Sequence, residues 1–176
     1  EDAPRRTDIY PSTDSMSKST KRNRLTIWDA WMREYSGECW SVHGNDDGIV
    51  IGCVNQDNDE GMIYTVGSDW QSNGYDAANW TETNVSTILG VDPGTDSTWT
   101  RGVCRGEGNL VAAAGEYSKK SNGWLLVSQD GGSTWENQTD ALVAMKGDVV
   151  NSLYQCQFVG KTLIVGGPEE MFTASF

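Results

Sequence analysis

The chain has 176 residues, with 20 Gly, 8 Trp and few long aliphatic runs, a composition typical of an all-β protein rather than a helical one. It contains no stretch of about 18 apolar residues, so no membrane span is expected. The net charge is −12, but residues 1–36 carry seven Lys/Arg against six Asp/Glu, a net of +1, so the remainder carries −13. This acidic body would repel phosphates, which argues against a general nucleic-acid surface.

The N-terminal segment differs from the rest of the chain. Residues 1–24 are polar, contain two Pro and show no apolar period, which predicts an extended arm without a core of its own. The arm carries a basic cluster that could dock on an acidic protein neighbour or on nucleic acid, or could remain solvated; its members are Lys18, Lys21, Arg22 and Arg24. Residues 25–32 predict a closing strand, because they are rich in strand formers. We assign residues 1–36 to this arm and lead-in strand.

Three later segments share one pattern, in which a short strand, a turn and a second apolar strand recur. The first strand ends and the second begins at His43 and Ile49, at Cys104 and Leu110, and at Cys156 and Thr162. A third strand is expected after each pair, at residues 62–66, 124–127 and 171–174. We therefore predict two complete repeats and a truncated third, over residues 37–85, 86–140 and 141–176.

The turn of the second repeat is the most specific feature of the sequence. The apolar run at residues 124–127 predicts a buried strand. In the turn that follows, Asp130 can accept hydrogen bonds from amides, and the glycines at 131 and 132 can adopt positive φ. Trp135 then begins a second extended segment, so the stretch predicts a hairpin with an acidic turn.

This turn resembles the Asp-box, or BNR repeat, whose pattern S-x-D-x-G-x-T-W is matched by Ser128, Asp130, Gly132, Thr134 and Trp135. In that family the box lies between the third and fourth strands of a β-propeller blade and serves folding. The resemblance therefore implies an all-β fold of Asp-box β-propeller-type blades. Similar repeats occur in sialidases, sorting receptors and photosystem assembly factors, so the resemblance leaves the partner open.

The first repeat carries a degenerate box, in which Asp69 and Trp80 take the places of Asp130 and Trp135 and are separated by an inserted loop. Trp70 and Tyr75 in this insertion are candidate contact residues, and their alternative role is packing between blades. Closed propellers need about 4–8 blades, so two and a half cannot close a ring. We expect a fragment of a longer propeller, a ring closed by other chains, or an open array covered by neighbours.

Few residues offer catalytic chemistry. His43 is the single histidine, so a histidine metal site or a Ser-His-Asp triad has little support, and we interpret it as a strand residue. The segment 57–61 resembles the start of a calcium loop, but an acidic turn is the favoured interpretation because the twelfth-position Glu is absent. Sialidases of the resembled family carry an arginine triad, whereas the blade region has only Arg101 and Arg105. We expect no catalytic residue, no metal and no cofactor.

The four cysteines lack the spacing of a zinc site. Cys39 and Cys53 face each other across the first predicted hairpin, where a cross-strand disulfide is conceivable, although four small apolar thiols are the favoured interpretation. Cys104 and Cys156 occupy equivalent positions in different repeats and are expected to lie apart.

Two classes of function remain. The first is a non-catalytic structural or binding module of a larger oligomeric assembly, with protein subunits as partners. An extracellular or virion component, such as a phage tail or capsid appendage, would fit the missing initiator Met and the incomplete ring. The alternative is a fragment of a BNR-type glycoside hydrolase or of a carbohydrate-binding protein, with a glycan ligand and with catalytic residues outside this chain.

Overall fold

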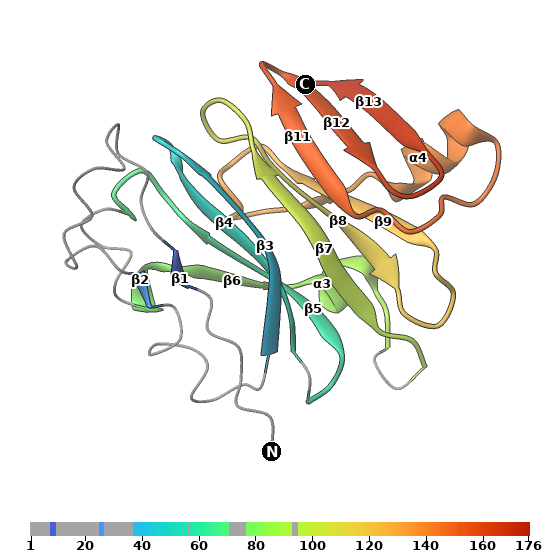
Figure 1. Ribbon diagram of the computed structural model, residues 1–176, viewed down its shortest axis with the longest axis horizontal. Coiled ribbons are helices and arrows are strands. Elements are labelled where there is room, and N and C mark those ends of the chain that lie inside the picture. Colours follow the sequence, from blue (N-terminus) through green and yellow to red (C-terminus); the bar gives the residue numbers. More distant parts are fainter. Residues whose placement is uncertain (1–7, 10–24, 27–36, 56, 71–76, 93–94) are drawn as a thin grey trace.

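The computed structural model describes residues 8–9, 25–26, 37–55, 57–70, 77–92 and 95–176, which are coloured in Figure 1. Most of these residues lie in strands that form three antiparallel sheets and one short two-stranded ladder, so the all-β prediction is confirmed. None of the three sheets closes on itself within the described residues. The strand predicted at 25–32 is described only at its start, where β2 (Leu25–Thr26) pairs with β1 (Asp8–Ile9).

Each large sheet is a meander, in which every strand pairs with the strand that follows it in the sequence. The first sheet contains β3 (Gly37–Asn45), β4 (Gly48–Asn55), β5 (Glu60–Val66) and β6 (Thr81–Asn84); the second contains β7 (Thr98–Arg105), β8 (Val111–Tyr117), β9 (Gly123–Ser128) and β10 (Glu136–Asn137); the third contains β11 (Gln155–Val159), β12 (Thr162–Gly166) and β13 (Met171–Ser175). The apolar strands predicted from the repeated pattern are present, except that the one expected at 153–156 begins two residues later.

Two short helices connect successive sheets, α3 (Val85–Leu89) between the first and second and α4 (Thr139–Lys146) between the second and third. A third, η1 (Ala77–Asn79), lies between β5 and β6 of the first sheet. The Asn84 side chain caps α3 by accepting from the Thr87 amide at 3.1 Å, and Gly90 ends it with a left-handed backbone, as glycine allows. Within the described residues, no helix combines the length and the apolar character needed to cross a membrane.

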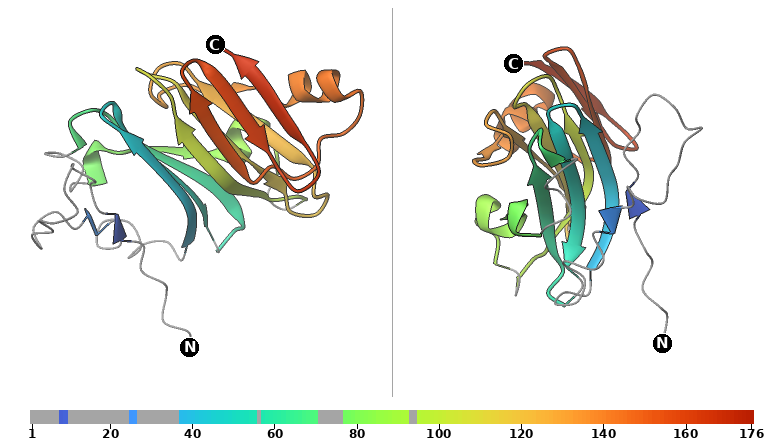
Figure 2. Two further views of the ribbon diagram at one scale, coloured as in Figure 1. Left: turned by 45° about the horizontal axis from the view of Figure 1, so that its top comes forward. Right: turned by 90° about the vertical axis from the view of Figure 1, so that its left-hand side faces the viewer.

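The sheets pack face to face in chain order, as Figure 2 shows. One buried cluster joins the first and second sheets and includes Val50, Ile63, Val103 and Trp124. Another joins the second and third sheets and includes Cys104, Leu125, Leu163 and Val165. Both faces of β4 and of β8 are covered by packed side chains, so β4 is buried along its whole length and β8 along nearly all of it. This double burial explains why these strands are continuous apolar runs rather than alternating ones.

The first strands of the three sheets, β3, β7 and β11, lie side by side (Figure 1). Glycines permit this close approach. A Cβ at Gly102 in β7 would lie 2.7 Å from the Tyr154 carbonyl oxygen and 2.8 Å from the Gln155 Cα. Similarly, a Cβ at Gly52 in β4 would lie 2.8 Å from Cγ2 of Thr100. Any larger residue at these positions would force the neighbouring sheets apart.

The prediction that Cys104 and Cys156 lie apart is wrong, because the third hairpin has a shorter turn than the second. The last pair of the β11–β12 ladder, Val159 and Thr162, has two residues between its members. The last pair of the β7–β8 ladder, Arg105 and Val111, has five. Cys156 in the third sheet therefore takes the position that Val103, and not Cys104, takes in the second sheet. This position is one residue earlier in the strand than the sequence spacing indicated. Side chains alternate along a strand, so this one-residue shift turns Cys156 toward the second sheet, where it packs in the same cluster as Cys104.

The first hairpin contains a disulfide between Cys39 and Cys53, which are direct partners in the β3–β4 ladder. The interpretation of all four cysteines as thiols is therefore wrong for this pair. It holds for Cys104 and Cys156, which are free in the structure. The disulfide lies next to a bulge between Cys39 and Ser41, and β7 has a bulge at the matching place between Thr100 and Gly102.

Candidate functional site

The turn over residues 128–135, which resembles an Asp-box in sequence and which we call the Asp-box turn for that resemblance, is held by a set of hydrogen bonds centred on Asp130. The Ser128 hydroxyl donates to Asp130 Oδ1 at 2.8 Å and accepts from the Gly132 amide at 2.8 Å. The Thr134 amide donates to Oδ1 at 2.8 Å, and the Thr134 hydroxyl donates to Oδ2 at 2.7 Å. Gly131 and Gly132 have φ of 79° and 100°, as predicted, which glycine adopts without steric cost.

The same hydrogen bonds favour the ionised form of Asp130. The bonds from the hydroxyl and amide of Thr134 lower its pKa from 3.8 to about 2, because they stabilise the carboxylate form. At neutral pH the group is therefore ionised and occupied as an acceptor. Asp130 serves the turn and is poorly suited to donate a proton in catalysis.

Trp135 joins the Asp-box turn to the neighbouring sheet. Its indole Nε1 donates to the Gly132 carbonyl at 3.1 Å and to the Thr83 hydroxyl of β6 at 3.2 Å. Its ring packs against the cluster between the first and second sheets. Gly132 lies close to Thr65 of β5, where a Cβ would come within 2.6 Å of the side chain. The turn, which belongs to the second sheet, therefore packs against β5 and β6 of the first sheet.

The residues predicted around the degenerate box lie on the outer face of the first sheet. Trp70 and Trp80 pack against a cluster formed by β4 and β5, which includes Ile51 and Tyr64. Asp69 follows β5 and is exposed. The remaining predicted contact residues lie outside the described part of the chain; they are Tyr75, Lys18, Lys21, Arg22 and Arg24.

The structure brings together an aromatic–arginine cluster that sequence reasoning did not identify. It consists of Trp40 on β3, Trp99 and Arg101 on β7, and Tyr154 just before β11. The Arg101 guanidinium carbon lies 4.0 Å from the Trp40 ring centroid, 4.7 Å from that of Trp99 and 5.7 Å from that of Tyr154. The two tryptophan rings meet edge to face with centroids 5.8 Å apart. The cation–π arrangement places a positive charge among three rings.

A buried carboxylate fixes the orientation of Arg101. Arg101 Nε donates to Glu116 Oε1 at 2.7 Å, and Nη2 approaches the same oxygen at 2.5 Å. The Ser152 hydroxyl donates to Oε2 of Glu116 at 2.5 Å. Since Glu116 is buried, these charge-assisted bonds hold the guanidinium rigidly. Trp40 and Tyr154 are 37% and 41% exposed, so the aromatic–arginine cluster is presented at the surface.

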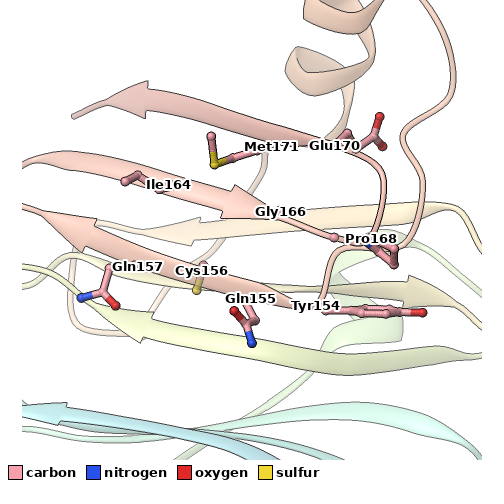
Figure 3. A pocket seen from close by; sticks show the side chains of 10 residues that line it. Tyr154, Gln155, Cys156, Gln157, Ile164, Gly166, Pro168, Glu170 and Met171 are labelled. Carbon is pink, nitrogen blue, oxygen red and sulfur yellow. The ribbon is translucent and has the colours of Figure 1, made fainter.

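The third sheet has one face packed on the second sheet and one exposed face, which we call the open face. A groove of about 470 Å³ runs along it (Figure 3). Tyr154, Gln155 and Gln157 contribute from the β11 side, and Ile164 and Met171 from β12 and β13. Met171 is 72% exposed. Tyr154 belongs to both features, so the groove and the aromatic–arginine cluster form one continuous surface.

A second cavity, of about 280 Å³ and mostly polar, lies between the first sheet and the Asp-box turn. The buried Arg105 lines it and donates to the carbonyl oxygens of Asp47 at 3.1 Å and Val66 at 3.4 Å. Burial lowers the pKa of Arg105, and its backbone amide donates to His43 Nδ1 at 3.1 Å. Burial and the nearby Arg105 charge lower the pKa of His43, so this imidazole is a neutral acceptor on β3, consistent with a strand residue.

No family model, curated protein or solved structure matches this chain. The fold and the surface define an all-β protein with exposed aromatic and apolar groups gathered over the first strands and the third sheet.

Proposed function

We propose that this chain is a non-catalytic structural or binding module of a larger assembly, built from Asp-box propeller-type blades. Three features support the blade assignment. The first two sheets are four-stranded meanders, the sheets pack face to face with their first strands adjacent, and the box turn lies between the third and fourth strands of the second sheet. The third sheet then represents a blade with three of its strands.

The open face of the third sheet is the observation that carries the proposal. The second strands of the first two sheets, β4 and β8, are buried along all or nearly all of their length, whereas the second strand of the third sheet, β12, alternates between buried and partly buried residues. Its neighbours β11 and β13 are exposed at alternate residues. The open face presents Ile164, Val159 and Met171 together with Gln155 and Gln157. A protein partner that covers this face would bury it as the second sheet buries the first.

The aromatic–arginine cluster extends this surface toward β3. Tryptophan, tyrosine and arginine are the side chains that contribute most often to the energy of protein interfaces. Because Glu116 already orients Arg101, little side-chain entropy would be lost when a partner binds. Glu116 accepts hydrogen bonds inside the fold and Asp130 accepts them within the exposed turn, which supports a binding role rather than a catalytic one.

We propose an extracellular or virion setting with this function. The supporting observation is the Cys39–Cys53 disulfide, because disulfides persist mainly in oxidising environments.

The proposal is tested by light scattering of the purified chain over a range of concentrations. We expect a mass above the 19.3 kDa of one chain, and we expect Met171→Glu to shift the equilibrium toward single chains. A charge at this position would have to be desolvated in the interface. Ile88→Glu is the matched control, since Ile88 is 38% exposed on α3, which contacts β5 and β7 of the first two sheets. A native chain that remains a stably folded monomer at every concentration would contradict the proposal.

A further inference from the structure

We propose that Cys104 and Cys156 are a site of disulfide formation, which would link the second sheet covalently to the third. Neither the fold nor the proposed function requires this modification. It rests on the contact between two thiols that the register of β11 brings together.

The backbones of β7 and β11 approach closely beside this pair. At Gly102 the distance to the neighbouring strand leaves no room for a Cβ, since the Gln155 Cα would be 2.8 Å away. Cys104 follows Gly102 by two residues on the same face, and Cys156 follows Gln155 directly. A disulfide requires the two Cα atoms to be about 4.4–6.8 Å apart, a separation that such closely packed strands can provide.

The thiols themselves are in contact. Cys156 packs against the same apolar cluster to which Cys104 belongs. The Cys156 thiol also donates to the Ala112 carbonyl at 3.7 Å, and Ala112 is the ladder partner of Cys104. A rotation about the side-chain bonds would bring the sulfurs to the bonding distance of about 2.05 Å.

Access to the two sulfurs differs. Cys104 is fully buried between the second and third sheets, whereas Cys156 is only partly buried. A small oxidant would therefore reach Cys156 first. Cys104 would act from inside the fold as the resolving thiol.

The reaction we propose is thiol–disulfide exchange with a small-molecule disulfide. The Cys156 thiolate attacks one sulfur of the oxidant, and the first small thiolate leaves and takes up the proton that Cys156 lost. The Cys104 thiolate then attacks Cys156 Sγ and expels the second small thiolate, which takes up the proton from Cys104. The two cysteines are oxidised by two electrons, and one small disulfide is reduced to two thiols.

The environment predicts that this exchange is slow at neutral pH. Burial, together with the neighbouring Cys104 thiol, raises the pKa of the Cys156 thiol well above its usual value. Because the thiolate is the attacking species, little of it is present at neutral pH. The experiment is therefore carried out at mildly alkaline pH.

The test incubates the full chain with oxidised glutathione, blocks remaining thiols with an alkylating reagent after denaturation, and digests with trypsin without reduction. Trypsin releases Cys104 in residues 102–105 and Cys156 in residues 147–161, while Cys39 and Cys53 remain together in residues 34–101. We expect 102–105 joined to 147–161 in the mass spectrum, with loss of both alkylated peptides. Two alkylated peptides after prolonged incubation, or glutathione retained on Cys156 of the native chain, would overturn the proposal.

Two variants separate the roles of the thiols. In Cys104→Ser we expect Cys156 to retain glutathione, because the resolving thiol is missing. In Cys156→Ser we expect Cys104 to remain alkylatable and free of glutathione, because it is buried. Glutathione on Cys104 in the folded Cys156→Ser chain would contradict the assigned order of attack.

Discussion

At the Asp-box turn, Ser128 and Thr134 donate to Asp130, and Gly131 and Gly132 supply the two positive φ angles. These residue types were sufficient to predict the turn, because each hydrogen bond joins residues that are close together in the sequence. Arg101 is the opposite case. Its partners Trp40, Glu116 and Tyr154 are distant in sequence, so its role could be identified only in the folded chain.

The first prediction concerns Asp130. A carboxyl whose pKa is lower in the folded than in the unfolded chain stabilises the fold above its unfolded pKa and loses that contribution as pH falls toward its folded pKa. For Asp130 this interval runs from 3.8 down to about 2. We expect the difference in free energy of unfolding between the native chain and Asp130→Asn to shrink across this interval.

Urea denaturation at a series of pH values measures that difference. The effect should be small, because Asp130 is exposed and solvent screens its charge. A difference that stays constant down to pH values near 2 would show that the Thr134 hydrogen bonds do not depend on ionised Asp130.

At the scale of the elements, turn length decides which face of a strand is buried. The turn between β11 and β12 is short, since Val159 and Thr162 pair directly, and this places Cys156 against the second sheet. The equal sequence spacing of the second and third hairpins suggested equal turns, because the number of residues between two strands does not show which residues pair in the ladder. A register that differs by one residue exchanges the two faces of a strand.

The second prediction concerns the β3–β4 hairpin. Its disulfide joins residues 14 positions apart, so its loss should lower the free energy of unfolding by about 3 kcal/mol, chiefly by freeing the unfolded chain. We expect this loss in the double variant Cys39→Ala/Cys53→Ala, measured by urea denaturation. A reducing agent should destabilise the native chain by a similar amount and leave the double variant unchanged. An equal effect of the reducing agent on both chains would contradict this interpretation.

At the scale of the whole molecule, the side chains of the second sheet are more deeply buried than those of the third sheet, which carries the open face. The second sheet is covered by the other two sheets, whereas the third is covered on one side only. Local stability follows buried apolar contacts, so the third sheet should open more readily than the second.

The third prediction follows from this gradient. We expect amide hydrogens of β13 to exchange faster than those of β8 in the single chain, as measured by mass spectrometry. Association through the open face should slow exchange in β13 and leave β8 unchanged. Equal protection of β13 and β8 in a monomeric sample would contradict the gradient.

The sequence by itself determined the all-β class, nearly all of the strands and the Asp-box turn, because these depend on contacts between neighbouring residues and on short apolar periods. The tertiary structure decided the contact between Cys104 and Cys156, the aromatic–arginine cluster and the open face. Each of these depends on how one sheet is placed on another. That placement is set by turn lengths, bulges and glycines such as Gly102, whose effect on distant strands appears only when the chain is folded.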